Sequence, residues 1–279
     1  MLELTGIGSV LHGIGLLYWL LAIGAVVLAI WKGKTQRAKT AWVLVAVAVF
    51  GFLPAKEVIE QAKRDAYARE AWAYFKKLCD EKSGEKIYKT YTGVKSVLVV
   101  KPLPPATEKD LYDQFWYGDP YSNATPWDKR GESAAATLTL DSRRPSGIQK
   151  GLDFVEFKND VGGGYQRITR PPSNDKMAGR EYVQTPISRF GVSWEDISKL
   201  NDRRYWVAGS RLRVLDLADN TIVAERTGYF IEAGFGSKAG GRRPWLASRG
   251  PNTTCPPLLG GDYSDNWFIT KVFRQDGEN

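Results

Sequence analysis

A long apolar run without a charged side chain constrains this sequence more than any other feature. Residues 7–31 are 25 consecutive residues that include no Lys, Arg, Asp or Glu. A helix rises about 1.5 Å per residue, so a run of this length exceeds the roughly 30 Å hydrocarbon core of a bilayer. The residues before it lack the basic region of a secretory signal peptide, and the run is longer than a signal core. The sequence therefore predicts a membrane-spanning helix.

A second apolar run follows after a short polar link. Residues 41–55 are 15 residues long, a length that is by itself also typical of a buried helix or a re-entrant segment. The link of nine residues, 32–40, is too short to hold a separate domain on the far side of a membrane. Trp31 and Trp42 flank the link, as aromatic residues do at a membrane interface. We therefore expect the second run to return across the bilayer, which makes residues 1–55 a transmembrane hairpin.

Basic residues decide which side of the membrane we expect the hairpin loop to face. The residues before the first run hold none, whereas the link holds four: Lys32, Lys34, Arg37 and Lys39. The positive-inside rule then places the link in the cytoplasm. Residues 56–70 also hold four basic residues, so a count over both sides gives a tie, and we follow the complete asymmetry around the first run. The predicted location is the bacterial inner membrane, multi-pass, with the N-terminus and the C-terminal domain in the periplasm.

Two cysteines, Cys79 and Cys255, lie in the part of the chain that we expect outside the cytoplasm. An oxidising compartment allows them to pair, and a bridge would span 255 − 79 = 176 residues. Chain entropy assigns a bridge of this kind about 5 kcal/mol of stability. Two unpaired buried thiols are the other interpretation, and the sequence alone leaves both open.

The remainder of the chain is mildly basic and contains no histidine. The chain has 39 basic and 31 acidic residues, of which residues 1–55 hold four and one, so residues 56–279 hold 39 − 4 = 35 and 31 − 1 = 30. The one histidine is His12, inside the first apolar run. Catalytic triads with a histidine base are therefore excluded from residues 56–279, and two cysteines alone cannot complete a zinc site. We predict that the protein is not an enzyme and holds no metal and no cofactor.

Hydrophobic periodicity predicts a membrane-anchored α+β protein. Residues 56–84 place apolar side chains at helical spacing with charges between them, which predicts an amphipathic helix that follows a bend at Pro54. Residues 85–279 are expected to form one domain, mainly antiparallel, with short helices. Turn residues at 218–220 predict a hairpin, and Ser193 is a candidate N-cap of a short helix. Alternating apolar residues predict strands at 95–100, 134–140, 153–158, 165–169, 211–217, 221–225 and 266–273.

One glycine-rich segment is similar to a phosphate-binding loop. Residues 234–239 read Gly-Phe-Gly-Ser-Lys-Ala, but residues 240–244 are Gly-Gly-Arg-Arg-Pro, which cannot open the helix that a dinucleotide site needs. We expect no nucleotide there. The same loop carries Lys238, Arg242 and Arg243, which present cationic groups either to an anionic partner or only to solvent.

An aromatic and acidic segment is the other candidate binding site. Residues 110–128 combine six aromatic residues with four acidic ones. Aromatic rings beside carboxylates bind sugars, and paired carboxylates catalyse glycoside hydrolysis. Rings of this kind also anchor a long loop to a core. The candidate binding residues in this segment are Trp116, Tyr117, Asp119, Tyr121 and Trp127.

These features favour a function in binding over catalysis. We expect a bacterial inner-membrane protein whose periplasmic domain binds another protein, as an immunity-type protein or a subunit of an envelope assembly does. The alternative is a periplasmic domain that binds or cleaves glycans through residues 110–128. The expected partners include the lipid bilayer but no nucleic acid. Residues 113–121 and 255–257 resemble segments of uncharacterised bacterial envelope proteins, and the resemblance implies no activity.

Overall fold

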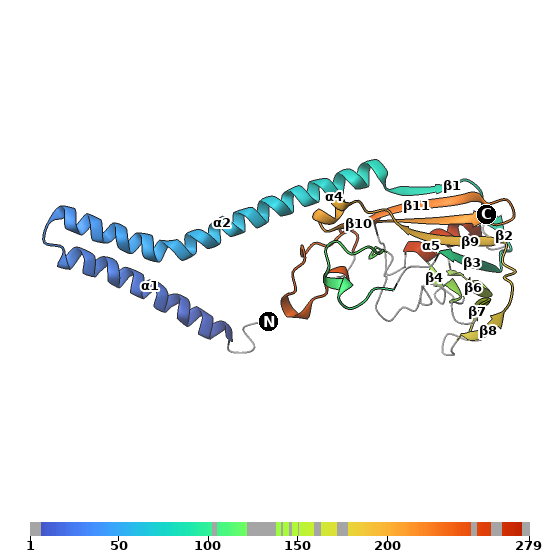
Figure 1. Ribbon diagram of the computed structural model, residues 1–279, viewed down its shortest axis with the longest axis horizontal. Helices are drawn as coiled ribbons and strands as arrows, with labels where there is room; N and C mark the ends of the chain where they lie inside the picture. Colours follow the sequence, from blue (N-terminus) through green and yellow to red (C-terminus); the bar gives the residue numbers. More distant parts are fainter. Residues whose placement is uncertain are drawn as a thin grey trace. The chain divides into compact units, whose positions relative to one another are not determined.

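The computed structural model divides the chain into two compact units, residues 1–69 and residues 70–279. Helix α1 (Ile7–Lys32) belongs to the first unit, and helix α2 (Gln36–Lys82) runs through the boundary between the two (Figure 1). We call the first unit the hairpin unit and the second the sheet domain. The structure describes residues 7–101, 105–121, 138–140, 142–144, 147–149, 151–158, 163–171, 178–246, 250–257 and 264–274.

A turn of three residues joins the two helices of the hairpin unit. Thr35 caps α2, because its Oγ1 accepts a hydrogen bond from the backbone N–H of Ala38 (3.2 Å). Gly33 is required at the turn, since a Cβ there would lie 2.4 Å from Cγ of Lys39. The turn is shorter than the expected nine-residue link, because the polar residues on both sides of it continue the helices.

Both helices of the hairpin unit are long and apolar enough to cross a membrane. Only 6% of the most apolar window of each helix is buried inside the protein. The outward surface of the hairpin unit therefore consists of large apolar side chains that water would solvate poorly. They include Leu17, Leu20, Leu21, Ile23, Val27, Leu44, Val47, Phe52 and Leu53.

Helix α2 continues through Pro54, the residue at which the sequence predicts that the membrane helix bends and passes into the amphipathic helix. Proline has no N–H, so the carbonyl of Phe50, four residues earlier, loses its helical donor. The hydroxyl of Tyr18 in α1 donates a hydrogen bond to this carbonyl. Helix α2 ends at Lys82, two residues before the expected end of the amphipathic helix at residue 84, and β1 (Gly84–Ile87) follows directly.

The sheet domain is built on a mixed sheet of nine described strands. Strand β3 (Ser96–Lys101) is parallel to both of its neighbours, and the other described pairs in this sheet are antiparallel. We expected a mainly antiparallel domain, and the sequence did not predict that the central strand β3 pairs in parallel on both sides. The order is β1, β11 (Thr221–Ile231), β10 (Val207–Asp216), β9 (Phe190–Asp196), β3, β6 (Phe154–Lys158), β7 (Tyr165–Thr169) and β8 (Gly179–Val183), with β12 (Thr254–Cys255) paired to β11.

Shorter elements complete the sheet domain. Two small two-stranded sheets pair β2 (Tyr91–Thr92) with β13 (Phe273–Arg274) and β4 (Ser142–Arg144) with β5 (Gly147–Gln149). The short helices in the described part of the domain are α4 (Leu200–Arg204), α5 (Ser264–Val272) and the 3₁₀ turns η2 (Asp110–Tyr112), η3 (Ala239–Gly241) and η4 (Pro244–Leu246).

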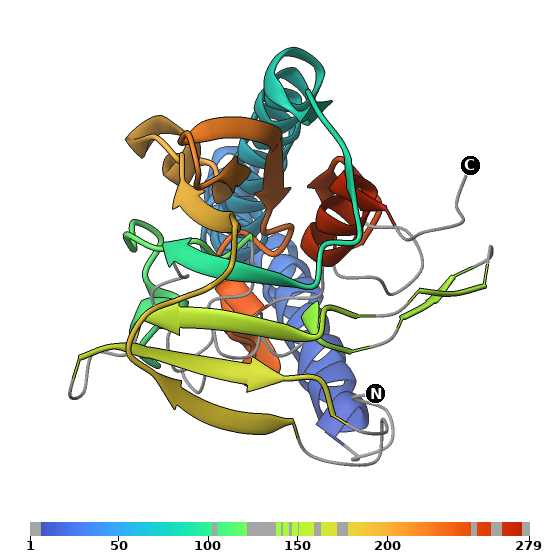
Figure 2. The same ribbon diagram turned by 90° about the vertical axis from the view of Figure 1, so that its right-hand side faces the viewer.

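The two faces of the main sheet pack against different helices. One face, with Trp194, Leu212 and Val214, packs against Phe268 and other residues of α5, which lies beside the sheet in Figure 2. The opposite face packs against the last turns of α2, where Ala71, Phe75 and Leu78 meet Val207, Tyr229 and Ile231. The alternation of side chains along a strand explains both contacts, because neighbouring residues of β10 point to opposite faces.

Three expected elements differ from the structure. Residues 266–273 form mainly helix α5, because Phe268, Ile269 and Val272 also fit a helical spacing and bury one side of it. The residues after Ser193 belong to strand β9, whose Val192 and Trp194 are buried, and α4 begins only at Leu200. Residues 138–140 lie outside the strands, and residues 134–137 lie outside the described part of the chain. The hairpin of β10 and β11 and the strands at 95–100, 153–158 and 165–169 are confirmed to within a few residues.

Candidate functional site

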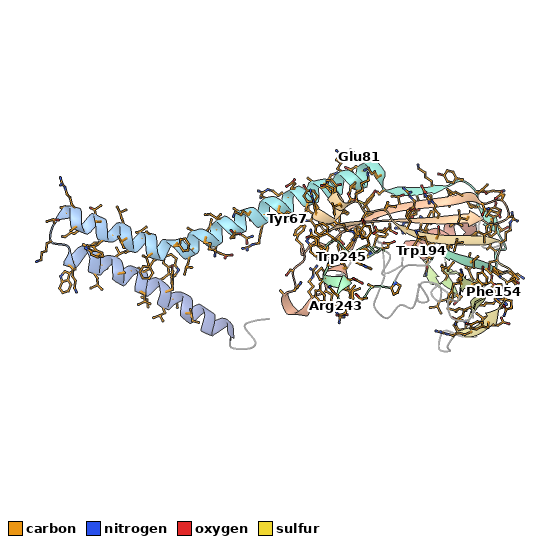
Figure 3. All side chains as sticks on the ribbon, in the orientation of Figure 1. Tyr67, Glu81, Phe154, Trp194, Arg243 and Trp245 are labelled. Atoms are coloured by element: carbon orange, nitrogen blue, oxygen red, sulfur yellow. A yellow bond between two sulfur atoms is a disulfide. The ribbon has the colours of Figure 1, made fainter. Side chains whose placement is uncertain are left out.

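The described part of the aromatic and acidic segment, up to residue 121, lies beside the glycine-rich segment. The indole Nε1 of Trp245 donates a hydrogen bond to the backbone carbonyl of Asp113 (2.6 Å). Arg243 forms an ion pair with Glu108, on the opposite segment. Figure 3 labels Trp245 and Arg243 on the second segment. Residues 105–121 and 232–246 therefore form one structure, which we call the two-loop cluster.

Three of the predicted binding residues are buried in the two-loop cluster. Trp116 is 8% exposed, Asp119 1% and Tyr121 6%. The carboxylate of Asp119 accepts a hydrogen bond from the hydroxyl of Ser210 in β10, and the hydroxyl of Tyr121 accepts one from Arg226 in β11 (2.9 Å). These side chains anchor the segment to the sheet, as the loop-anchoring interpretation expects. Trp127 lies outside the described residues.

Arg203 joins the loop segment to the rest of the domain, a role that no sequence pattern indicates. Its Nη2 donates to the carbonyl of Gly118 (2.7 Å) and to a carboxylate oxygen of Asp196 (2.9 Å). The guanidinium group also lies over the ring of Trp245, 5.0 Å from its centroid. The side-chain amide of Gln114 donates in turn to the carbonyl of Arg203 (2.9 Å). The contacts with Gly118 and Gln114 join residues 85 and 89 positions apart, so no local sequence pattern reveals them.

Two aromatic side chains of the same segment are exposed on the surface. Tyr117 is 94% exposed and Phe115 is 44% exposed. The backbone between them is fixed, because Asp113 accepts a hydrogen bond from the N–H of Phe115 (3.0 Å) and the ring of Trp116 packs against Gly118. A Cβ at Gly118 would lie 2.0 Å from Cζ2 of Trp116, so this position requires glycine. The structure thus divides a run of adjacent aromatic residues into buried anchors and outward rings.

The three predicted cations of the second segment have partners inside the two-loop cluster. Arg242 pairs with the fully buried carboxylate of Glu232, which also accepts hydrogen bonds from the N–H groups of Gly234 (2.9 Å) and Gly236 (2.6 Å). The ammonium group of Lys238 lies 5.3 Å from the ring centroid of Tyr112. Together with the Arg243–Glu108 pair, these contacts give all three cations structural roles.

Another fully buried carboxylate, Glu156 in β6, lies away from the two-loop cluster. It accepts hydrogen bonds from Arg167 (2.9 Å), from the hydroxyl of Ser188 (2.6 Å) and from the N–H of Ile187 (3.0 Å). Burial alone would raise the pKa of Glu156, but the hydrogen bonds from Ser188 and Arg167 outweigh burial and hold the pKa below its ordinary value. The carboxylate fixes the segment before β9 to the sheet.

Asp216, at the end of β10, is also strongly held in its ionised form. Its carboxylate accepts hydrogen bonds from Arg189 (2.7 Å) and from the hydroxyl of Tyr91 (3.3 Å). The hydrogen bond from Arg189 is the main reason why the pKa of Asp216 falls to about 2. Arg189 in turn lies over the rings of Tyr91 and Phe190. This cluster fixes the connection between β10 and the small β2–β13 sheet.

A disulfide joins Cys79, near the end of α2, to Cys255 in β12. The two Cα atoms are 5.6 Å apart although 176 positions separate the residues. The bridge lies beside Phe75 and Leu78, where α2 packs against the sheet. The sequence leaves open whether the two cysteines form a disulfide or remain free thiols, and the structure contains the disulfide.

Comparisons with known proteins identify no related protein. No protein-family model matches the chain, and the searches of curated proteins and of solved structures find no significant match. Among the described residues, no group of three or more His, Cys, Asp or Glu side chains is arranged to hold a metal ion.

Proposed function

We propose that the protein is a membrane-anchored binding module that holds an α+β domain on the periplasmic side of a bacterial inner membrane. The observation that carries this proposal is helix α2. Its first half contributes exposed apolar residues such as Leu44 and Phe52 to the hairpin unit, and its last turns contribute buried residues such as Phe75 to the sheet domain. One helix therefore serves as an anchor and as a structural part of the domain.

The distribution of charge supports the proposed orientation. Lys32, Lys34, Arg37 and Lys39 all lie at the closed end of the hairpin, so the positive-inside rule places that end in the cytoplasm. The disulfide agrees with this orientation, because disulfides persist in oxidising compartments and are rare in the cytosol. Two independent features thus favour a periplasmic sheet domain.

We propose that the domain works by binding another protein rather than by catalysis. The charged residues that the sequence offers as a candidate site take part in structural contacts: Asp119 with Ser210, Arg242 with Glu232, and Arg243 with Glu108. An immunity-type protein that captures a toxin at the envelope and a subunit of an envelope assembly are two forms of this function. Both require a stable domain held at the membrane, and neither requires a reactive group.

Membrane topology tests the first part of the proposal. Protease added to intact spheroplasts should digest residues 70–279, while a cytoplasmic control protein stays intact. Thiol alkylation under denaturing conditions should label Cys79 and Cys255 only after reduction. Protection of the domain, or free thiols in the native protein, would place the domain in the cytoplasm and overturn the orientation.

Affinity purification tests the second part. Full-length protein, solubilised in mild detergent from its own host, should carry a stoichiometric protein partner that a hairpin-only fragment of the chain does not carry. Absence of any stoichiometric partner under conditions that preserve a known membrane complex would overturn the binding function.

A further inference from the structure

A groove between the two helices of the hairpin unit ends at the cluster of basic residues. It has a volume of about 390 Å³ and is lined by side chains from residues 25–32 of α1 and residues 42–50 of α2. We propose that this groove, the headgroup groove, binds an acyl chain of one anionic phospholipid, and that Lys32 and its basic neighbours bind the phosphate of the headgroup. The inference rests on the proposed membrane anchor and requires neither the proposed protein partner nor the proposed orientation.

The lining of the headgroup groove matches a hydrocarbon chain. Ala25, Ala29 and Ala46 line it with single methyl groups, which leave space between the helices. Every lining residue except Lys32 is apolar or aromatic. Within the hydrocarbon core a polar occupant would find no hydrogen-bond partners along such a wall, whereas an acyl chain needs none.

The length of the groove fits one leaflet of a bilayer. Ala25 and Lys32 are 32 − 25 = 7 residues apart, which is about 10 Å along α1. One leaflet contributes about 15 Å of hydrocarbon, half of the core. Trp31 and Trp42 are 80% and 61% exposed at the end that holds Lys32, and tryptophan is enriched at the level of the headgroups. An acyl chain in the groove therefore places its headgroup beside Lys32.

The basic residues at this end of the hairpin have no acidic residue nearby in the sequence. Residues 4–56 contain no Asp or Glu, although they contain five Lys and Arg residues. The basic side chains of α2 further along are neutralised within the helix, as Arg64 is by Glu57 (2.6 Å). Basic pockets between membrane helices attract anionic headgroups. The charge at the closed end of the hairpin therefore complements a phosphate group.

Two of the cations lie close to each other where the groove ends. Lys32 lines the groove, and the side chain of Lys39 lies beside Gly33, because a Cβ at Gly33 would be 2.4 Å from Cγ of Lys39. Both lysines lie outside the apolar runs, and long basic side chains of this kind extend toward the headgroups. Two ammonium groups can donate several charge-assisted hydrogen bonds to one phosphate.

A second groove of the hairpin unit provides an internal comparison. It has a volume of about 310 Å³ and is lined by residues such as Trp19, Ile23 and Val47, with no charged residue among them. An acyl chain can lie there too, but no cation lines this groove to select the headgroup. We therefore expect selection by headgroup charge only at the headgroup groove.

Native mass spectrometry of the full-length protein, released from detergent micelles, tests lipid selection. The protein is mixed with equal amounts of phosphatidylglycerol and phosphatidylethanolamine that carry the same acyl chains, so that the two lipids differ in headgroup charge. We expect one phosphatidylglycerol molecule to be retained at least about fivefold more often than phosphatidylethanolamine. Equal retention of the two lipids would overturn the inference.

A charge variant tests the role of Lys32. Lys32→Gln should lower the retention of phosphatidylglycerol about fivefold, the factor that one basic residue near an anionic headgroup contributes. Lys56→Gln is the matched control, because it removes the exposed lysine that follows the second apolar run, and it should change retention less than about twofold. Unchanged retention by Lys32→Gln would contradict the assignment of the headgroup to this lysine.

Variants that fill the groove test the site of the acyl chain. Val49→Trp fills the headgroup groove and should abolish the preference for phosphatidylglycerol, whereas Val47→Trp fills the second groove and should keep it. The two valines are 62% and 56% exposed, so both substitutions leave the packing between the helices intact. Ala29→Phe fills the headgroup groove from α1 and should act as Val49→Trp does. Circular dichroism establishes that each variant keeps its helices.

The remaining outcomes separate this inference from the proposed function. A preference that survives both Val49→Trp and Ala29→Phe would overturn the groove as the lipid site. A dimer that Val49→Trp dissociates, with no lipid retained by the wild type, would overturn the lipid in favour of a second copy of the chain and leave the membrane anchor standing. Full-length protein that stays in solution without detergent would overturn both the anchor and the lipid site.

Discussion

The hydroxyl of Tyr18 in α1 donates a hydrogen bond to the backbone carbonyl of Phe50 in α2, which is the carbonyl that Pro54 leaves without a helical donor. In an apolar environment an unsatisfied carbonyl is costly, because no water replaces the missing partner. Tyr18 therefore supplies the hydrogen-bond donor that Pro54, 36 positions away, lacks. The pair connects the two helices of the hairpin unit by more than apolar packing.

Removal of this hydroxyl should destabilise the hairpin only while the proline is present. Tyr18→Phe should lower the stability of the hairpin unit by about 1 kcal/mol, as typical hydrogen bonds between membrane helices contribute. In a Pro54→Ala background the restored N–H satisfies Phe50, so the same substitution should cost much less. Unfolding by dodecyl sulfate in mixed micelles measures the stability of the full-length wild type, of Tyr18→Phe, of Pro54→Ala and of the double variant. Additive effects would show that Tyr18 and Pro54 act independently.

Loss of the disulfide should destabilise the sheet domain strongly. Cys79→Ser and Cys255→Ser each remove a cross-link that spans 176 residues, and chain entropy predicts a loss of about 5 kcal/mol at most. Thermal unfolding of the detergent-solubilised protein with and without reductant measures the effect. Reductant should lower the unfolding temperature of the wild type and leave the double variant unchanged. A wild type insensitive to complete reduction would contradict the prediction.

The apolar runs, the hairpin of β10 and β11 and several strands were predictable because their signals are local. A run of 25 uncharged residues or an alternating pattern beside turn residues needs no knowledge of the rest of the fold. Helix α5 shows the limit of such signals. Its nine residues fit both a helical and an alternating pattern, and only packing of Phe268 and Ile269 against the sheet decides between them.

The candidate site shows a second limit. Trp116 and Tyr117 are adjacent and chemically similar, so the sequence places both in one binding surface, yet one is buried and the other outward. The residues that follow them, Gly118 and Asp119, are held by Arg203 and Ser210 from 85 and 91 positions away. Contacts at such separations are set by the fold, and no spacing within residues 110–128 predicts them.

Acid should destabilise the sheet domain through Asp216 and Glu156. The pKa of each carboxyl group is lower in the folded than in the unfolded chain, so below about pH 4 the unfolded chain binds more protons. Stability is therefore fully present above that pH and falls as the pH decreases toward 2. Urea unfolding between pH 2 and pH 7 measures how the free energy of unfolding changes with pH.

The Asp216→Asn variant shows how much of the pH dependence of stability comes from Asp216. The stability difference between the wild type and Asp216→Asn should shrink as the pH falls, because a protonated aspartic acid resembles asparagine. Tyr88→Phe, which removes no carboxyl group, is the control and should keep the slope of the wild type. A difference that stays constant down to pH 2 would show that the Arg189 hydrogen bond does not lower the pKa of Asp216 as described.

A methyl group at Gly118 should disturb the loop that displays Tyr117. The Cβ of Gly118→Ala would lie 2.0 Å from the ring of Trp116, so the ring has to leave its buried position. Overpacking of this kind typically costs about 1–3 kcal/mol, measured here by urea unfolding. Gly250→Ala is the matched control, because a Cβ there meets no atom within 4 Å. If Gly118→Ala is as stable as Gly250→Ala, the packing of Trp116 against Gly118 does not hold the loop in place.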